Sequence, residues 1–434
     1  MHKPSRMDDL LEKLQRDAFG YFLNQTNVVN GLVGDNTRPD THCSIAATGL
    51  GLAAYTVGVE RGFMPRREAA TRTLTTLRFF RDSPQGEDPN ATGYQGFYYH
   101  FLDMKHGRRA WRCELSIIDS ALLIAGALTA MMYFDGEDEG EKEIRKLGQS
   151  LYERMNWKWA MNDRPTVSHG WKPECGFLRY GWGGYSEASL LYVLGLGSPT
   201  HPLQPESYLA WTSTYQWENL YSYDFLFAAP LFIHQLSHVW IDFLGIQDEF
   251  MRQKRSDYFE NSRRATHIQQ QYAIRNPKRF KGYQKHCWGF TAGDGPGPAK
   301  QCVDGIERRF FGYVARGIPY GPDDGTIAPW TVIASLPFAP ELVLETLRYL
   351  LESYPEIRSE SGLLSSFNPT FNSDGSSTQG WVCPHHYGLD QGPVVLMIEN
   401  HRSEFLWRLM RKCPFIVNGL RRASFRNGWL GSVR

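Results

Sequence analysis

Hydrophobic positions recur at helical spacing along most of the chain, and they predict two kinds of helix. Three segments are apolar on nearly every face and predict buried helices, at 44–55, 114–128 and 225–243. Four others carry charged residues on one face and predict partly exposed helices, at 10–22, 66–80, 139–154 and 249–274. Further helices are expected at 328–336, 341–351 and 391–407, and 96–101 is expected to form a cleft loop or a short strand.

The alternation of apolar and amphipathic helices predicts an all-α fold, an (α/α)6 toroid of about twelve helices. In such a fold an inner ring is buried on both sides, an outer ring is half exposed, and loops line a cleft at one end. No polar linker rich in Ser, Pro and Gly divides the chain, so we expect residues 1–434 to form a single domain. The alternatives are an irregular helical domain or two domains.

Charge and composition exclude several classes of function. The net charge is +1, which gives no electrostatic basis for binding nucleic acid or an anionic membrane. No apolar run is long enough to cross a membrane, and the start of the chain has no apolar signal core. The chain as it stands is therefore expected in the cytoplasm, or in the periplasm if a signal was removed. The seven cysteines are scattered and indicate neither a disulfide framework nor a metal site.

Aromatic residues make up 14% of the chain, a surplus that suits a carbohydrate cleft in which rings stack on sugars. The stretch 183–199 is the strongest candidate for the chemistry. Its glycine pair predicts a turn, Tyr185 or Ser186 is expected to begin a helix, and two glycines and a proline end it. Glu187 is then in the first helical turn beside an apolar seam, which suits an acid that holds a proton near neutral pH. The alternative is a glutamate that only complements the helix dipole.

Other acids and aromatics enter apolar surroundings at helix starts. Glu114 and Asp119 flank the start of a buried helix, five residues apart, so only one of them needs to point into the cleft. The predicted substrate-binding residues at the remaining turns and helix starts are Glu114, Tyr185, Trp288, Asp294, Asp324, Asp390 and Gln391. Each Asp-Gly among them could also be a simple turn. No phosphate loop, dinucleotide fingerprint, nucleophile elbow or zinc-protease motif is present, so no cofactor is expected.

His234 and His238 have i, i+4 spacing, and Asp242 continues the same face. This spacing could hold a metal ion on a helix. The His-Glu-x-x-His motif and a further ligand cluster are both missing, so buried hydrogen bonding or recognition of sugar hydroxyls is the preferred interpretation, and no metal is predicted.

Two carboxylates facing a cleft, with aromatic platforms and no cofactor motif, indicate glycoside hydrolysis. Nine segments together resemble the glycoamylase-like family, which includes the β-1,2-glucanases of glycoside hydrolase family 144 and a related domain of cyclic β-1,2-glucan synthases. The segments are 45–49 (IAATG), 97–103 (FYYHFLD), 114–123 (ELSIIDSALL), 184–188 (GYSEA), 237–243 (SHVWIDF), 258–262 (YFENS), 288–292 (WGFTA), 324–329 (DGTIAP) and 390–393 (DQGP).

The resemblance covers nearly the whole chain and implies an (α/α)6 barrel that hydrolyses β-1,2-linked glucan or sophoro-oligosaccharides. It implies Glu187 as the general acid and places a second acidic position at Asp119, while the identity of the base stays open. Inversion is the expected stereochemistry. The alternatives are a retaining transglycosylase on the same scaffold and a non-catalytic glycan-binding protein. The basic regions 296–317 and 418–434 depart from the family pattern and are expected to alter chain-length preference or substrate entry.

Overall fold

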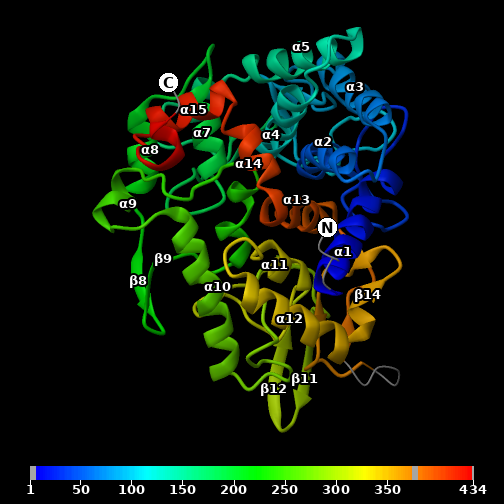
Figure 1. The fold of residues 1–434 in the computed structure, drawn as a ribbon, viewed down its shortest axis with the longest axis vertical. Coiled ribbons are helices and arrows are strands. Elements are labelled where there is room, and N and C mark those ends of the chain that lie inside the picture. The colour runs from blue at the N-terminus through cyan, green and yellow to red at the C-terminus, as the bar shows by residue number, and fades with distance from the viewer. Residues whose placement is uncertain (1–5, 374–379, 433–434) are drawn as a thin grey trace.

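The computed structural model describes residues 6–373 and 380–432, a helix-rich part of the chain (Figure 1). It contains fifteen α-helices, where the sequence predicts about twelve. They are α1 Arg6–Asn24, α2 Ile45–Glu60, α3 Arg66–Asp82, α4 Ile117–Tyr133, α5 Glu139–Glu153, α6 Trp157–Met161, α7 Ser189–Gly197, α8 Pro205–Thr212, α9 Glu249–Gln253, α10 Tyr258–Arg275, α11 Pro329–Ala334, α12 Pro340–Ser353, α13 Gly388–Ser403, α14 Phe405–Met410 and α15 Pro414–Arg422.

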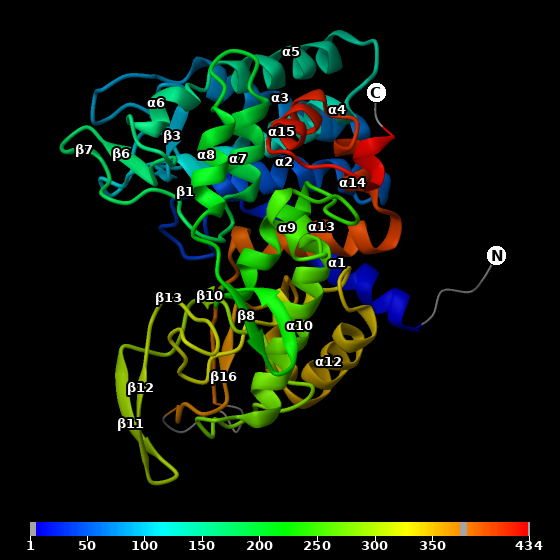
Figure 2. The ribbon, with the colours of Figure 1, turned by 90° about the vertical axis from the view of Figure 1, so that its left-hand side faces the viewer.

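The predicted helix-rich character is confirmed, and short strands that form small antiparallel sheets accompany the helices. The strands are β1 Cys43–Ser44, β2 Gly93–Tyr94, β3 Phe97–Tyr99, β4 Phe101–Leu102, β5 Leu115–Ser116, β6 Gly170–Lys172, β7 Gly176–Phe177, β8 Trp217–Leu220, β9 Tyr223–Leu226, β10 Ala292–Gly293, β11 Ala299–Val303, β12 Ile306–Phe310, β13 Val314–Ala315, β14 Arg358–Ser359, β15 Gly362–Leu363, β16 Phe367–Asn368 and β17 Trp381–Val382. One sheet has five strands in the order β2-β3-β5-β6-β7, and β11 and β12 form a hairpin that projects from the body of the molecule (Figure 2).

The helices that are buried on nearly every side pack against one another. Helix α2 contacts α4 and α13, α4 contacts α7, and α13 contacts α11. Amphipathic helices cover this group from outside, with α1 on α13, α5 on α4 and α12 on α11. In Figure 1, α13 runs between α2 and α4 on one side and α11 and α12 on the other. The predicted difference between apolar and amphipathic segments therefore corresponds to a difference in packing.

Helices α2 and α4 approach each other closely because glycines meet at their crossing. A Cβ atom on Gly49 would lie 2.3 Å from the carbonyl oxygen of Leu122, and one on Gly126 would lie 2.0 Å from the carbonyl oxygen of Gly49. These distances are shorter than any van der Waals contact, so a side chain at either position would force the helices apart. The small residues of α2 therefore allow its close packing against α4.

The apolar segment 225–243 does not form the predicted α-helix. It contains the end of β9 and two 3₁₀ turns, Leu231–His234 and Leu236–Val239, the second of which ends before Trp240. A side chain of α10 and a backbone amide of α7 account for part of this departure. Ser262 Oγ donates to the His234 carbonyl at 2.7 Å, and Ser237 Oγ accepts from the Leu190 amide at 3.1 Å. Two further 3₁₀ turns are Pro355–Ile357 and Gly428–Gly431.

Three side chains attach the basic C-terminal region, up to residue 432, to the helical body. Arg422 donates to the carbonyls of Leu196 and Leu203, Phe425 is buried, and Trp429 Nε1 donates to the Asp242 carbonyl at 2.8 Å. Residues 433 and 434 of the predicted tail lie outside the described residues. Within residues 6–373 and 380–432, no helix combines the length and the apolar character that crossing a membrane requires.

Candidate active site

A cavity of about 690 Å³ lies where the N-terminal ends of five buried helices meet. Ser44 and Ser116, which cap α2 and α4, line it, and so does Glu187 just before α7. Trp330 in the first turn of α11 and Tyr387 at the start of α13 complete the set. The positive ends of these helix dipoles therefore face one space, which favours negative charge there.

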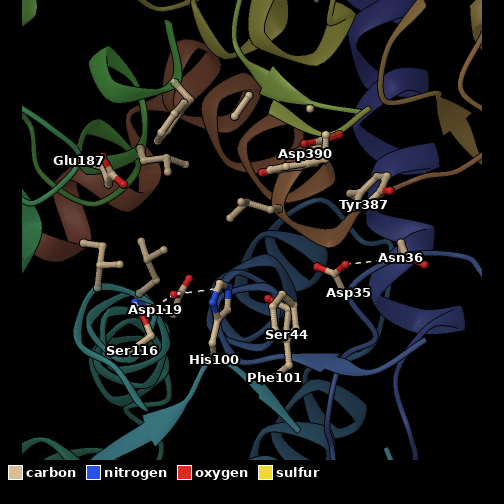
Figure 3. A pocket seen from close by; sticks show the side chains of 18 of the residues that line it. Asp35, Asn36, Ser44, His100, Phe101, Ser116, Asp119, Glu187, Tyr387 and Asp390 are labelled. Atoms are coloured by element: carbon tan, nitrogen blue, oxygen red, sulfur yellow. Dashed lines mark hydrogen bonds and ion pairs between the residues drawn. The ribbon is translucent and has the colours of Figure 1, made fainter. Parts of the chain in front are cut away.

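The cavity is rich in carboxylates, and Figure 3 shows several of them directed into it from different elements. Six carboxylic side chains line it, against the guanidinium of Arg38 and the imidazoles of His100 and His169. The six are Asp35, Glu114, Asp119, Glu187, Asp294 and Asp390.

Glu187 is in the turn that precedes α7 and not in the first helical turn as predicted. The helix begins at Ser189, with Ala188 as its N-cap. Withdrawal from bulk water raises the pKa of Glu187 to about 7. A backbone hydrogen bond of Glu187 opposes this rise, and the negative charge of Asp119 adds a smaller contribution to it. A glutamic acid in this state can hold a proton near neutral pH, as the sequence analysis expected for a general acid.

Asp119 is buried in the first turn of α4, three residues after the N-cap Ser116. The Ser116 hydroxyl accepts a hydrogen bond from the Asp119 amide at 3.2 Å and donates one to Asp119 Oδ2 at 2.5 Å. The cap therefore fixes both the helix start and the rotamer of the carboxylate. The second contact of this carboxylate is His100, whose Nε2 lies 3.6 Å from Oδ2.

Glu114 lines the same part of the cavity and hydrogen-bonds His100 Nδ1 at 2.8 Å. Glu114 and Asp119 both face the cavity, although their spacing of five residues in the sequence required only one of them to do so. The reason is that the α-helix begins at Ile117, so Glu114 lies in the extended segment before it and the helical spacing rule does not apply to the pair.

A second group of acids lies on the side of the cavity formed by α13 and the loop before β1. Asp390, in the first turn of α13, accepts a hydrogen bond from Ser365 Oγ at 2.6 Å. Burial, together with the charges of Asp35 and Asp294, holds the pKa of Asp390 well above its usual range despite that bond. Burial likewise raises the pKa of Asp35, although Asn36 Nδ2 donates to its carboxylate at 2.8 Å.

Asp294 connects three segments that are distant in sequence. It accepts from Arg38 Nη2 at 2.7 Å and from the hydroxyl of Tyr387, and the Sγ of Cys383 lies at 4.0 Å. Its own backbone carbonyl accepts from Ser366 Oγ at 2.7 Å. Asp294 therefore joins the wall of the cavity to the start of α13.

Aromatic rings form much of the remaining wall. Trp111 and Tyr313 line the cavity while 64% of each side chain's surface remains exposed, whereas Trp182 packs at 4.3 Å from the ring of His169. Trp111 and Arg112 both have positive φ, 50° and 51°, a conformation that non-glycine residues rarely adopt. The Trp111 ring packs against His42 at 4.1 Å and Phe101 at 5.1 Å, so its orientation is fixed at the rim.

Five of the predicted site residues line the cavity, and they are brought together from separate elements of the fold. They are Glu114, Asp119, Glu187, Asp294 and Asp390.

Four others lie in the core beside the cavity. His234 contacts the Ala228 carbonyl and Asn261, His238 Nε2 contacts Ser262 Oγ at 3.0 Å, and Asp242 is ion-paired with Arg411. Tyr185 packs among Tyr215, Tyr258 and His234. None of Tyr185, His234, His238 and Asp242 lines the cavity, so their predicted contacts with substrate have no support in its lining.

The last three predicted residues, Trp288, Asp324 and Gln391, are buried and bond other parts of the protein. Trp288 is fully buried and its Nε1 donates to Thr346 Oγ1 at 3.0 Å, and Gln391 donates to the Leu363 carbonyl at 3.0 Å. Asp324 pairs with Arg316 at 2.7 Å, and Arg316 also donates to the Gly293 carbonyl at 2.7 Å. Asp324 thus holds the loop that presents Tyr313. None of Trp288, Asp324 and Gln391 lines the cavity, so their predicted contacts with substrate have no support in its lining.

The sequence analysis assigned no role to several residues that line the cavity, chiefly Asp35, Arg38, His100, Trp111, His169, Tyr313 and Tyr387. His100 belongs to one of the segments that carry the family resemblance, and this is the signal that could have identified it. The described residues contain no group of three or more His, Cys, Asp or Glu side chains placed to hold a metal ion.

Comparison with known proteins shows which proteins this chain is similar to. The family model described as "Putative glucoamylase" matches residues 179–414, which is more than half of the chain. The chain is 28% identical to an "Exo beta-1,2-glucooligosaccharide sophorohydrolase (non-reducing end)" from Parabacteroides distasonis. That match covers 96% of this chain and spans 58% of the relative's length.

Two solved structures are similar over nearly the whole chain. A "putative glucoamylase" from Bacteroides uniformis is 29% identical, with a TM-score of 0.86 and coverage of 99% of this chain and 100% of that one. A beta-1,2-glucanase from Parabacteroides distasonis is 26% identical, with a TM-score of 0.84 and coverage of 98% of this chain and 61% of that one. The predicted family is confirmed: the chain belongs to the glycoamylase-like family that the "Putative glucoamylase" model describes.

Proposed function

We propose that this chain is a glycoside hydrolase that cleaves β-1,2-linked glucan or sophoro-oligosaccharides, with Glu187 as general acid and Asp119 as general base. The observation that carries the proposal is that these two carboxyl groups face one cavity in different surroundings. Glu187 has a pKa of about 7 and can deliver a proton, while Asp119 accepts a hydrogen bond from Ser116 and faces His100. Glycoside hydrolysis requires such a pair of carboxyl groups.

The substrate class rests on the relatives, two of which are named for β-1,2-glucan or its oligosaccharides. The cavity supports it, since its volume of about 690 Å³ lies in the range of small-molecule sites and its walls combine rings with polar groups. Glu114, Asp294 and Asp390 are proposed to bind sugar hydroxyls. Trp111, exposed at the rim, is proposed to stack on a glucose unit outside the central cavity.

The fold proposed for this function is an (α/α)6 toroid formed by residues 1–434 as one domain. The contacts among α2, α4, α7, α11 and α13 support an inner ring. The 3₁₀ turns of 231–239 take the sixth place, because Ser237 bonds the start of α7 and the second turn contacts α13. Core residues from Leu11 to Leu430 form one cluster, which supports a single domain.

The test is incubation of the purified protein with linear β-1,2-glucan, followed by chromatography of the products and a reducing-end assay. Release of shorter β-1,2-oligosaccharides with new reducing ends is expected. Linear β-1,3-glucan and starch serve as controls for linkage. Products longer than the substrate would identify a transglycosylase instead, and binding without any product would identify a glycan-binding protein.

A further inference from the structure

His100 lies at the edge of the cavity beside Asp119 (Figure 3), and a second carboxylate, that of Glu114, contacts its other ring nitrogen. Its Nδ1 lies 2.8 Å from Glu114 Oε1, and its Nε2 lies 3.6 Å from Asp119 Oδ2. The imidazole is nearly parallel to the ring of Phe101, at 4.0 Å between centroids and 13° between planes. Both ring nitrogens therefore face negative charge, and one ring face is covered.

The backbone fixes this arrangement. Strands β3 and β5 pair so that Tyr99 is opposite Leu115, which brings His100 and Glu114 next to each other. The His100 amide also donates to the Glu114 carbonyl at 3.0 Å. The side-chain contact between His100 and Glu114 is thus set by the register of the sheet.

A neutral imidazole carries one N–H and can donate to only one of the two carboxylates, whereas an imidazolium can donate to both. The charged groups that face the ring are Glu114, Asp119 and Asp35, and Lys172 faces Glu114 from β6. Burial acts to lower the pKa of His100, but the three carboxylates outweigh it and raise that pKa to about 9.

The two oxygens of Asp119 have different surroundings. Oδ2 accepts the hydrogen bond of Ser116 and faces His100. No side chain or amide within residues 6–373 and 380–432 donates a hydrogen bond to Oδ1. A carboxylate restrained through one oxygen presents the other in a fixed direction, which is what a general base requires.

We propose that His100 is a positioning residue, an imidazolium that bridges Glu114 and Asp119, restrains Asp119 through Oδ2 and leaves Oδ1 to accept the proton of the attacking water. The bridge itself follows from the geometry, and its effect on catalysis rests on the proposed function. Glu114 acts in it as the counterion of His100.

The bridge can be tested without any substrate. Protein labelled with ¹⁵N in its histidine rings is titrated by NMR, and the His100 signals are assigned by their absence in His100→Gln. The ring is expected to titrate near pH 9 in the wild type, and its midpoint is expected to fall by at least one pH unit in Glu114→Gln and in Asp119→Asn. A wild-type midpoint at or below 6.5, or no change in the two variants, would overturn the bridge.

The effect on catalysis is tested by the pH dependence of kcat/KM on linear β-1,2-glucan. Loss of the cation in His100→Gln is expected to move the acidic limb to higher pH by about one unit and to lower kcat about tenfold at pH 6, with KM changed less than threefold. His106→Gln, which removes an exposed histidine outside the cavity, is the matched control and is expected to behave as the wild type.

These outcomes separate the two proposals. An unchanged acidic limb in both His100→Gln and Glu114→Gln would overturn the positioning role even if the enzyme is active. Absence of activity in the wild type would refute the proposed function, and the NMR titration would still decide the bridge. Circular dichroism establishes whether each variant is folded. If His100→Gln does not fold, Glu114→Gln still provides the test.

Discussion

Asp119 and Glu187 face one cavity from the starts of two different helices, and they are coupled through their charges. Burial raises the pKa of Glu187 to about 7, and the negative charge of Asp119 contributes to that rise. Asp119 itself accepts a hydrogen bond from Ser116 and faces the imidazole of His100. The environment of Glu187 favours its protonated form, while Asp119 is held through Oδ2 by Ser116 and His100. This difference between the surroundings of Glu187 and Asp119 leads to testable expectations for each residue.

Glu187→Gln is expected to retain the fold and to lose about 10²–10⁴-fold in kcat on β-1,2-glucan, because the leaving oxygen loses its proton donor. In the wild type, kcat/KM is expected to fall as the pH rises through about 7, where Glu187 loses its proton. The matched control is Glu206→Gln, an exposed glutamate in the first turn of α8. Turnover at the wild-type rate in Glu187→Gln would remove Glu187 from the mechanism.

The raised pKa of Glu187 predicts that the stability of the folded chain depends on pH. Between about pH 4.5 and pH 7 the unfolded chain has released the Glu187 proton and the folded chain still holds it, so the free energy of unfolding decreases as the pH rises through this window. Glutamine does not ionise. Relative to the wild type, Glu187→Gln is therefore expected to gain up to about 3 kcal/mol between pH 4 and pH 8. Urea unfolding of both proteins at pH 4 and pH 8 measures this gain. If the free energies of unfolding of variant and wild type differ by the same amount at both pH values, the raised pKa of Glu187 is contradicted.

Much of this fold could be predicted from the sequence because burial leaves a pattern. The apolar segment 44–55 became α2, and the amphipathic segment 66–80 became α3, within a few residues at each end. The existence of each of these two helices depends on the spacing of apolar residues within one segment, and the local sequence pattern is sufficient to predict it.

Features that depend on distant partners could not be predicted. Residues 225–243 form 3₁₀ turns whose carbonyl and hydroxyl groups bond α10 and α7, and nothing in their own spacing reveals these partners. The helix after Glu187 begins at Ser189, and the amide of Leu190 is bonded by Ser237, which is 47 positions away in the chain. Asp35 was missed for a similar reason, since it lies in a loop without periodicity and reaches the cavity only through the fold.

Activity is expected to survive removal of divalent metal ions. The only metal-like spacing in the sequence analysis was that of His234, His238 and Asp242, and in the structure Ser262 contacts His238 while Arg411 pairs with Asp242. Proton transfer between carboxyl groups and substrate needs no metal ion. Rates measured before and after dialysis against EDTA are expected to agree. Inactivation that one divalent ion reverses would contradict this prediction.

Trp111→Ala is expected to weaken binding of long glucans and to leave the shortest cleaved oligosaccharide unaffected. The exposed ring, fixed by His42 and Phe101, offers a flat face at the rim of the cavity. A loss of about 1 kcal/mol, the size of one aromatic contact, corresponds to about a fivefold higher KM. Tyr320→Ala removes a ring that is 68% exposed and does not line the cavity, and it serves as the control. An equal rise in KM for all chain lengths would contradict an outer subsite.

Hydrolysis is expected to invert the anomeric configuration. Inversion needs room for a water molecule between the two carboxyl groups, about 6.5–9.5 Å, whereas retention needs about 5–5.5 Å. Asp119 belongs to α4 and Glu187 precedes α7, so the two approach the cavity from separate helices, and no hydrogen bond joins their side chains in the described part of the chain. A transglycosylase would instead have to retain, because it must keep a glycosyl-enzyme intermediate for a sugar acceptor. NMR of the first product decides between them: the α-anomer is expected from the β-linked substrate, and an initial β-anomer would refute inversion and favour the transglycosylase.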